Sequence, residues 1–334
     1  MTTVPSSPAA PADQRVIDAP DRRDGLVYVV TPEIQLAVDV ALATGRPLLL
    51  RGDPGSGKSS LAAYVALNRG WRYYEHVVTS RTQARDLLWT FDTVRRLADA
   101  QTHGTDRELH DTDYIEPGVL WWAFAPHSAR RRGASSAGPP TKPAVEPNDA
   151  INASRSGDHA VVLIDEIDKA DPDLPNGLLV PLGSNEFVIT ETGQRVRKET
   201  PAGDLDPDQS RHLIVITTNE ERELPNAFLR RCIVTWLPHP NADRLVVIAR
   251  AHMTAYAGGM SASDEELADQ LAERVVAIRK EARRQGLRPP STAEYLDALR
   301  ACRTLGVTPD SDLWLQLRDL ALVKHQQPGD AVEP

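Results

Sequence analysis

Residues Gly52 to Ser59 have the types and spacing needed to hold the phosphates of a nucleotide. This stretch, GDPGSGKS, fits the phosphate-binding pattern G-x-x-x-x-G-K-[ST] at every fixed position. Its glycines let the backbone turn so that successive N–H groups face phosphate oxygens at the start of a helix. Lys58 adds a mobile positive charge, and the hydroxyl of Ser59 suits a Mg²⁺ ion that bridges two phosphates.

The neighbouring sequence supports this interpretation of the loop. The apolar run Leu48–Leu50 precedes the loop, and a helix-like run follows Lys58. The alternative is a glycine-rich turn that binds nothing, which this strand and helix context disfavours. We expect the following residues to bind the nucleotide: Gly52, Asp53, Pro54, Gly55, Ser56, Gly57, Lys58, Ser59 and Ser60.

Two adjacent carboxylates follow a second apolar run. Residues 161–164 are all apolar, and Asp165 and Glu166 come directly after them. Successive side chains at a strand end point in different directions, so Asp165 can hold Mg²⁺ through water while Glu166 orients an attacking water. An acidic pair is also a common way to end a strand. The phosphate-binding loop elsewhere in the chain favours the catalytic interpretation.

A polar amide and a pair of arginines complete the set of candidate residues. Asn219 follows the apolar run 213–217, where its side chain could bind the nucleophilic water or the γ-phosphate, or simply cap a turn. Residues 224–232 predict a short helix that ends in Arg230 and Arg231. A guanidinium there could neutralise a transferring phosphoryl group, also from a neighbouring subunit. The alternative is an arginine pair that binds the carboxyl end of its own helix.

The elements that must position these residues alternate between strand and helix. Thr31 and Pro32 predict a helix start, and residues 84–100 predict a helix with an apolar stripe. Gly193 predicts the turn of a hairpin over residues 187–196. Strands are expected at 47–51, 71–78, 160–164 and 213–217, with a helix at 58–68 between the first two. Strands this apolar are typical of a parallel sheet covered on both faces, so the fold class is α/β.

Two stretches are rich in proline, serine, alanine or glycine and poor in apolar side chains. Residues 1–24 predict a disordered tail, and residues 127–158 predict a flexible insertion that contributes little to a core. The insertion contains Arg130, Arg131 and Arg132. A solvated loop is the simplest interpretation of so short a basic run, and contact with an acidic partner or nucleic acid is the alternative.

Beyond residue 240 the pattern becomes purely helical. Helices are expected at about 243–257, 264–284, 291–304 and 310–325. The sequence therefore predicts an α/β domain over residues 25–239 and a small all-α domain over 240–326. A short tail, residues 327–334, follows the second domain.

Composition excludes several classes of protein. The 38 basic and 47 acidic residues give a net charge of −9, which repels a phosphate backbone and makes nucleic acid an unlikely partner. Cys232 and Cys302 stand alone, which suggests neither a disulfide framework nor a zinc site. With no leader pattern at the start and no apolar segment of membrane-spanning length, we expect a soluble cytoplasmic protein.

Four segments in this order resemble those of the AAA+ ATPases, and within them the MoxR-like branch of chaperones. The segments are GDPGSGKS, VVLIDEIDKA, TTN and LPNAFLRRC, followed by the all-α region, and the resemblance covers about residues 28–304. The family's finger arginine closes its helix just before the next strand. The resemblance implies Lys58 and Ser59 in Walker A, Asp165 and Glu166 in Walker B, Asn219 as sensor 1 and Arg231 as an arginine finger.

The resemblance also implies a fold and an activity. The fold would be a P-loop NTPase with a parallel sheet core of AAA+ type, followed by a small helical lid. The activity would be Mg²⁺-dependent ATP hydrolysis in a homo-oligomeric ring, a hexamer, that remodels a protein client or a partner with a VWA domain. A GTPase is disfavoured because the sequence has no Asn-Lys-x-Asp segment.

Other readings depart from this one at single features. The family's sensor 2 arginine is missing, because Ala293 stands in its place, and Arg288 just upstream is a candidate to replace it. A missing sensor 2 is compatible with a nucleotide-gated scaffold that does not hydrolyse ATP. A DNA-directed motor or loader would need Arg130–Arg132 to join other basic residues on one surface.

Overall fold

The computed structural model describes residues 24–103, 109–134, 142–199, 212–308 and 311–323. Contacts divide the chain into two compact units. The sheet unit comprises residues 30–52 and 65–237, and the helical unit comprises the chain before Val30, residues 53–64 and the chain from Pro238 onward. The predicted tails at 1–24 and 327–334 lie outside the described residues, apart from Asp24. The domain boundaries drawn from the sequence stay a prediction.

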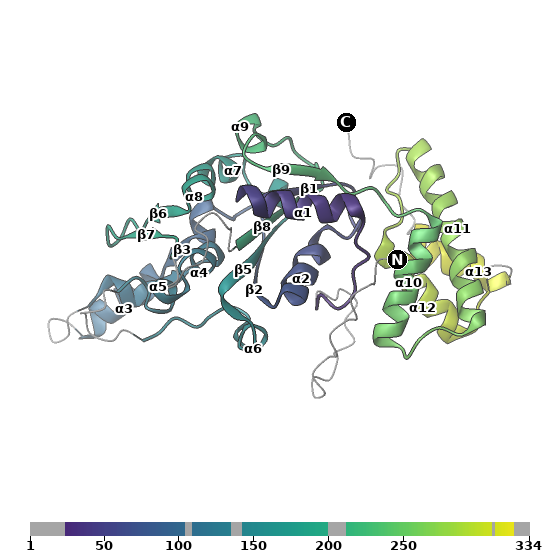
Figure 1. The fold of residues 1–334 in the computed structure, drawn as a ribbon, viewed down its shortest axis with the longest axis horizontal. Coiled ribbons are helices and arrows are strands. Elements are labelled where there is room, and N and C mark those ends of the chain that lie inside the picture. Colours follow the sequence, from purple (N-terminus) through teal and green to yellow (C-terminus); the bar gives the residue numbers. More distant parts are fainter. Residues whose placement is uncertain (1–23, 104–108, 135–141, 200–211, 309–310, 324–334) are drawn as a thin grey trace. The chain divides into compact units, whose positions relative to one another are not determined.

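A parallel five-stranded sheet forms the centre of the sheet unit (Figure 1). Its strand order is β2-β5-β8-β1-β9, and all four neighbouring pairs are parallel. The carboxyl ends of its strands therefore meet at one edge. The strands are β1 (Leu48–Arg51), β2 (Trp71–Val77), β5 (Ser156–Asp165), β8 (His212–Thr218) and β9 (Ile233–Trp236). The predicted α/β class is confirmed, because a parallel sheet core is followed in the chain by helices.

Local sequence explains where the first helices begin and end. The helix α1 (Pro32–Thr44) begins as predicted, because the Thr31 Oγ1 accepts a hydrogen bond from the Ile34 amide at 3.3 Å. Gly45 ends this helix in the left-handed region, with φ 63°. The second helix is α2 (Lys58–Arg69), which begins at the loop lysine.

Aromatic side chains dominate the core beside β2 and β5. The short helix α4 (Val119–Phe124) packs on both strands and buries Trp121 and Trp122 almost completely. The helix α5 (Pro126–Arg130) packs against α4, and the α7 helix (Asp173–Gly177) packs against α8 (Leu179–Ser184). The predicted hairpin is confirmed, since β6 (Glu186–Val188) pairs antiparallel with β7 (Arg195–Arg197) and Gly193 has φ 68°.

The single helix predicted over residues 84–100 is wrong. The structure has a 3₁₀ turn at Ala84–Leu87, then strand β3 (Trp89–Phe91) and helix α3 (Thr93–His103). The strand pairs antiparallel with β4 (Ile115–Pro117), which follows a second 3₁₀ turn at Asp111–Tyr114. Leu87, Leu88 and Trp89 are all buried, whereas Val94 is 80% exposed. Three consecutive buried residues do not fit one face of a helix, so the stripe was a coincidence of spacing.

The flexible insertion predicted over residues 127–158 also differs from the structure. Residues 135–141 lie outside the described part, but the flanking residues pack. Glu146 is buried, and its carboxylate binds Arg72 at 2.9 Å, Arg130 at 2.8 Å and the Tyr74 hydroxyl at 2.9 Å. Asn152, at the end of α6 (Asp149–Asn152), is buried and accepts from the Tyr73 amide at 2.8 Å. Buried polar groups with hydrogen-bond partners hold this segment despite its few apolar side chains.

The predicted solvated role of the basic run 130–132 is wrong for Arg132, whereas Arg130 and Arg131 are exposed. Arg132 is buried, where it donates to the carbonyl oxygens of Ile115 and Lys142 and pairs with Glu116. Arg130 pairs with Glu146. Both arginines pair with carboxylates of the same chain, although the Arg130 side chain remains 54% exposed.

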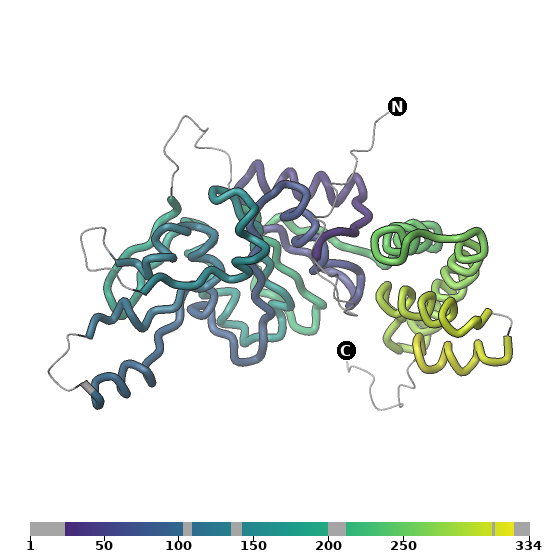
Figure 2. Tube along the Cα trace, turned by 90° about the horizontal axis from the view of Figure 1, so that it is seen from below, coloured from purple at the N-terminus to yellow at the C-terminus, as the bar shows by residue number. Residues whose placement is uncertain are grey.

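The helical unit has its own core. The predicted helices form as α10 (Ala242–Tyr256), α11 (Ala262–Arg284), α12 (Thr292–Leu305) and α13 (Asp312–Arg318), the last continuing as a π-helical turn to Val323 (Figure 2). Capping boxes begin α11 at Ser261 and Asp264 and α12 at Ser291 and Glu294. Leu271, Tyr295 and Leu299 are among the side chains buried between these helices.

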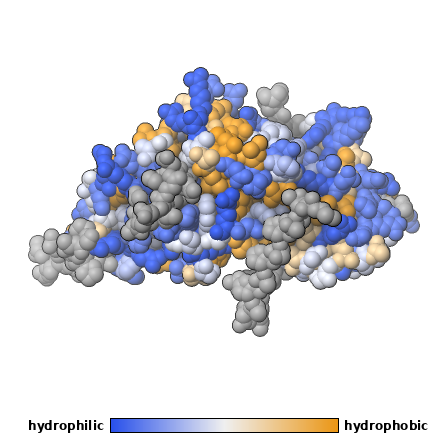
Figure 3. All heavy atoms as spheres, viewed as in Figure 1, coloured by the Kyte–Doolittle hydropathy of each residue, from blue (hydrophilic) through white to orange (hydrophobic). Residues whose placement is uncertain are grey.

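An apolar patch stands out in the upper middle of Figure 3, over α1 and β9, where Leu36 is 64% and Val234 42% exposed.

Cys232 and Cys302 are both buried, free thiols, and burial raises the pKa of Cys232 to about 12. None of the helices in the described ranges has the length and apolar character needed to cross a bilayer.

Candidate functional site

The first of the paired carboxylates is buried where β5 ends. Asp165 is 2% exposed, and its Oδ1 accepts a hydrogen bond from the Thr217 hydroxyl at 2.6 Å. The same threonine oxygen accepts from the Glu166 amide at 2.8 Å. Thr217 lies on β8, the neighbouring strand, so the sheet itself fixes the turn that carries both carboxylates. The sequence analysis did not assign a role to Thr217.

The second carboxylate, Glu166, meets the predicted sensor residue. The Asn219 Nδ2 donates to Glu166 Oε1 at 3.2 Å, and the Lys169 Nζ lies 2.6 Å from Oε2. Donation of a hydrogen bond to the Glu166 carboxylate raises the pKa of Lys169. Glu166 has a left-handed backbone, with φ 60°, which is uncommon for a residue with a side chain. The structure thus brings together two residues that the sequence places 53 positions apart.

Asp168 is a positioning residue that the sequence analysis missed. It is 2% exposed, and its Oδ2 accepts from the backbone amides of Asn219 at 3.1 Å and Glu221 at 2.9 Å. These bonds fix the turn after β8 and therefore the place of the Asn219 side chain. The signal was present in the sequence as a third acid in the run DEID, two residues after Glu166.

The phosphate-binding loop has the backbone that its glycines predict. Gly52, Gly55 and Gly57 have φ values of 144°, 74° and 93°. A Cβ on Gly52 would lie 2.4 Å from the Leu237 carbonyl oxygen, and one on Gly55 would lie 2.2 Å from the Cβ of Ser291. Both positions are too close for any side chain, so these glycines are required by space as well as by conformation.

Polar groups of the loop suit an anionic ligand. Lys58 is 5% exposed, and its ammonium donates to the Asp53 carbonyl oxygen at 2.9 Å, within its own loop. The Ser56 hydroxyl is buried and has no hydrogen-bond partner among the described residues. A buried charge and an unmatched hydroxyl are costly unless a ligand or water completes them. A polyphosphate matches these donors, and Ser59 at the first turn of α2 offers the oxygen that Mg²⁺ prefers.

An arginine and a histidine lie next to the Asp53 carboxylate within the helical unit. Its Oδ2 lies 3.1 Å from the Arg283 Nη2 and 3.3 Å from the His239 Nε2. Burial, together with the charge of Arg279, lowers the pKa of His239 to about 4. The imidazole is therefore neutral at pH 7, and only the Arg283 contact is an ion pair there.

The start of α12 is held by its own partners. Arg288, the candidate substitute for sensor 2, pairs with Glu294, the residue that also caps the helix. Arg279 is 4% exposed and donates to the carbonyl oxygens of Pro290 and Pro240, both at 2.8 Å. Burial lowers the pKa of Arg279 to about 10. Ala293 is exposed and carries no group that could bind a phosphate.

Comparison with protein families identifies the sheet and its loop. The profile described as AAA domain (dynein-related subfamily) matches residues 47–232, more than half of the chain. The chain belongs to this AAA family. An AAA domain of this kind is a nucleotide-binding P-loop fold, so the loop and the paired carboxylates lie in the part of the chain that the family shares.

Solved structures with similar chains are remote from this AAA protein. RuvB of Thermotoga maritima is 14% identical, with a TM-score of 0.40, and the match covers 86% of this chain and 67% of that one. Domain III of DnaA from the same organism is 16% identical, with a TM-score of 0.40, and the match covers 92% of this chain and 95% of that one. NtrX of Brucella abortus, in complex with ADP, is 13% identical, with a TM-score of 0.41. The match covers 89% of this chain and 55% of that one. TM-scores of this size do not carry the assignment, which is based on the family profile. Curated proteins gave no match.

The two arginines at the end of α9 (Asn226–Leu229) are exposed in this AAA chain. The Arg231 Nη1 donates to the Ala227 carbonyl at 3.0 Å, so within one subunit Arg231 binds its own short helix. The backbone carbonyl of Arg230 accepts from Arg46 at 3.2 Å. Both arginines are therefore accessible to a neighbouring subunit, and the finger role of Arg231 stays a prediction.

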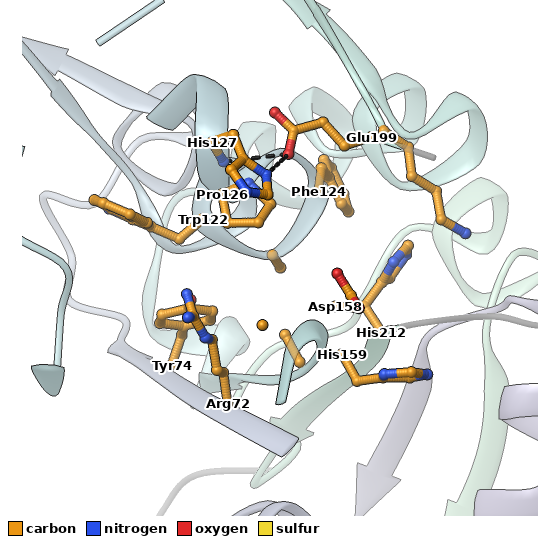
Figure 4. A pocket seen from close by; sticks show the side chains of 14 residues that line it. Arg72, Tyr74, Trp122, Phe124, Pro126, His127, Asp158, His159, Glu199 and His212 are labelled. Atoms are coloured by element: carbon orange, nitrogen blue, oxygen red, sulfur yellow. Dashed lines mark hydrogen bonds and ion pairs between the residues drawn. The ribbon is translucent and has the colours of Figure 1, made fainter. Parts of the chain in front are cut away.

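Two cavities lie at opposite ends of the strands in the AAA sheet unit. One, of about 600 Å³, lies beside the carboxyl ends of β1 and β8 and is lined by Arg51, Thr218 and Glu220 among others. The other, of about 230 Å³, lies near Asp158 and His159 at the amino end of β5 (Figure 4). There, His127 is hydrogen-bonded to Glu199 at 2.9 Å. Because Asp165 and Glu166 lie at the carboxyl end, only the first cavity adjoins the candidate site.

Proposed function

We propose that this chain hydrolyses ATP and uses the energy to remodel a protein partner. The observation that carries the proposal is the bonded arrangement at the carboxyl ends of β5 and β8. There, Thr217 fixes Asp165, and Asn219 holds Glu166, next in sequence. A pair of carboxylates fixed in this way, in a chain with a complete phosphate-binding loop, supports hydrolysis of a phosphoanhydride rather than nucleotide binding alone.

Each residue has a separate task under this proposal. Lys58 and the loop amides bind the phosphates, and Glu166 accepts a proton from the attacking water, which Asn219 helps to orient. The carboxylate of Asp165 and the hydroxyl of Ser59 would hold Mg²⁺. When bound, Mg²⁺ neutralises phosphate charge and fixes the geometry of the phosphates. The mixture of one buried carboxylate and one hydroxyl fits a magnesium ion that keeps several waters.

Nucleotide binding and phosphate release test the proposal directly. We expect the purified chain to bind ATP with Mg²⁺ and to release phosphate, and Lys58→Ala to weaken binding because the loop loses its ammonium. Arg69→Ala, an exposed basic residue at the other end of α2, is the matched control. Wild-type protein that binds ATP but releases no phosphate would support a nucleotide-gated scaffold instead. Equal affinity in Lys58→Ala would remove Lys58 from the site.

We also propose that the chain works as a homo-oligomeric ring, most simply a hexamer, of the MoxR-like branch. The four segments and their order support that branch. The exposed arginines after α9 and the apolar patch over α1 and β9 are surfaces that a neighbouring subunit could cover. The partner under this proposal is a protein client or a protein with a VWA domain.

A trapping variant tests the partner proposal. Glu166→Gln should retain ATP and hold its client, so affinity capture with this variant and ATP should enrich proteins that capture with Lys58→Ala does not. A VWA-domain protein among them would support the MoxR-like role. Identical captures from the two variants would contradict ATP-dependent client binding. No observation favours a DNA-directed motor, because Arg130 and Arg132 are engaged within the chain.

A further inference from the structure

Asp53 is a carboxylate inside a loop that is built to hold phosphate. It follows Gly52 directly, and its side chain is 35% exposed. Within the helical unit it pairs with Arg283, which lies in the last turn of α11 and is 59% exposed. The phosphate-binding loop and α11 are therefore joined by an ion pair.

The charges near this ion pair favour an anion. Lys58 and Arg279 are both buried, and the electrostatic neighbours of Arg279 include Asp53 and Arg283. Arg279 donates to two backbone carbonyls, and its Nη2 has no hydrogen-bond partner among the described residues. The guanidinium groups of Arg279 and Arg283 thus both interact with the charge of Asp53. A polyphosphate on the loop would bring additional negative charge to the same place, where it would repel Asp53 and attract Arg283.

We propose that Asp53 and bound phosphate compete for Arg283, so that Asp53 lowers nucleotide affinity and Arg283 raises it. Without nucleotide, Asp53 holds the guanidinium. With nucleotide, Arg283 turns to the phosphates and supplies from α11 the positive charge that Ala293 at the start of α12 cannot supply. The inference rests on the proposed binding of ATP by the loop.

Competition predicts effects of opposite sign for the two partners. Asp53→Asn removes the competitor and a repulsive charge while keeping the side chain's shape, so ATP affinity should rise roughly fivefold. Arg283→Ala should lower it by a similar factor, and Arg283→Lys should retain most of the affinity because it keeps the charge. A purely structural ion pair would give the same sign for both, since removing either partner breaks the same contact.

Equilibrium titration with ATP and Mg²⁺ measures these affinities without relying on turnover. The matched control is Arg284→Ala, since Arg284 is the adjacent exposed arginine and pairs with Glu281 on its own helix. Arg284→Ala should bind ATP as the wild type does. Thermal unfolding without nucleotide should differ little among the variants, because the pair is partly exposed to water.

The outcomes separate this inference from the proposed function. Affinity changes of the same sign in Asp53→Asn and Arg283→Ala, or no change in either, would overturn the competition while Lys58→Ala still weakens binding. If the wild type itself binds no nucleotide, the proposed function fails and the competition fails with it. A fivefold loss in Arg284→Ala equal to that in Arg283→Ala would reduce the effect to general surface charge and would also overturn the inference.

Discussion

Glu166 is held at both carboxylate oxygens before any substrate is present. Asn219 donates to one oxygen and Lys169 pairs with the other. Its left-handed backbone at φ 60° adds a cost of about 1 kcal/mol that the surrounding bonds must offset. Strain of this kind, at the end of a strand beside a buried aspartate, is typical of a residue placed for chemistry rather than for packing.

Replacing this carboxylate by an amide should separate binding from hydrolysis. In Glu166→Gln the side chain keeps its shape and Asp165 is unchanged, so ATP affinity should stay within about twofold. Phosphate release should slow by roughly 10²- to 10⁴-fold, because the proton acceptor is lost. Single-turnover measurement of phosphate release checks this, with Glu221→Gln as the control. Unchanged release would assign the proton to another group.

Buried histidines should make the fold sensitive to mild acid. Burial lowers the pKa of His239 to about 4 and that of His212 to about 3, from an ordinary 6.5. Between these values and 6.5, the unfolded chain takes up protons that the folded chain does not. Stability is therefore complete above pH 6.5 and falls as the pH drops, by up to about 1.4 kcal/mol per pH unit for each imidazole.

Urea unfolding at pH 7 and pH 5 measures that loss. His239→Gln should unfold with less dependence on pH than the wild type, because one of the two titrating groups is gone. His127→Gln is the control, since its imidazole is 86% exposed. Equal dependence in the wild type and His239→Gln would show that His239 is not buried neutral in solution.

At the scale of elements, buried charge holds the segment that joins α5 to β5. Glu146 is 3% exposed at its side chain and binds two arginines and a tyrosine hydroxyl. Removing its charge leaves Arg72 without a counter-charge in a largely buried place. Glu146→Gln should therefore lower the free energy of unfolding by at least about 2 kcal/mol.

Chemical denaturation of Glu146→Gln, with the exposed Asp149→Asn as control, checks this expectation. A deletion of residues 128–157 should be more damaging still, because it also removes Asn152 and Arg132 from their buried bonds. A deletion variant with the same free energy of unfolding as the wild type would show that these bonds contribute nothing to stability.

The sequence predicted the elements whose apolar spacing was regular. The strands β1, β5 and β8 each contain an unbroken apolar run, at residues 48–50, 160–164 and 213–216, and α11 has a capping box and a long amphipathic repeat. The prediction of one helix over residues 84–100 was wrong because long-range pairing of β3 with β4 overrides a local helical pattern. The prediction of a flexible insertion was wrong because composition does not reveal a buried glutamate, Glu146, whose partners are up to 74 residues away.

The candidate site was predictable to a similar degree. Motif spacing identified Lys58, Asp165, Glu166 and Asn219, since their order in the chain follows the strand ends. The role of Thr217 could not be assigned, because it depends on which strands are neighbours. Asp168 is visible in the sequence as a third acid, but its partners after β8 also depend on the strand order. Strand order is a property of the fold and is not written in any local pattern.

At the scale of the whole molecule, ring assembly can be tested with two inactive variants. Arg231→Ala should bind ATP but not hydrolyse it if Arg231 acts on a neighbouring subunit, and Lys58→Ala should be inactive for lack of bound nucleotide. In mixed rings, an intact loop from the first variant can face an intact arginine from the second. The mixture should therefore recover some activity.

Subunit exchange must be established for this experiment by labelled mixing. Arg230→Ala serves as the matched control, because it removes the neighbouring arginine of the same helix. Full exchange without recovered turnover would contradict a finger that acts between subunits. If Arg230→Ala hydrolyses no ATP while Arg231→Ala is fully active, the arginine finger is Arg230 and not Arg231.

The two buried thiols make such mixing experiments practical. Cys232 has a pKa near 12 and Cys302 is likewise buried with a raised pKa, so neither presents a thiolate to solvent at neutral pH. Maleimide dyes should leave the native chain unmodified. A single cysteine introduced at an exposed position outside the proposed subunit contacts, such as Val94, would then carry one dye per chain, and energy transfer between donor and acceptor chains would report subunit exchange without a cysteine-free background.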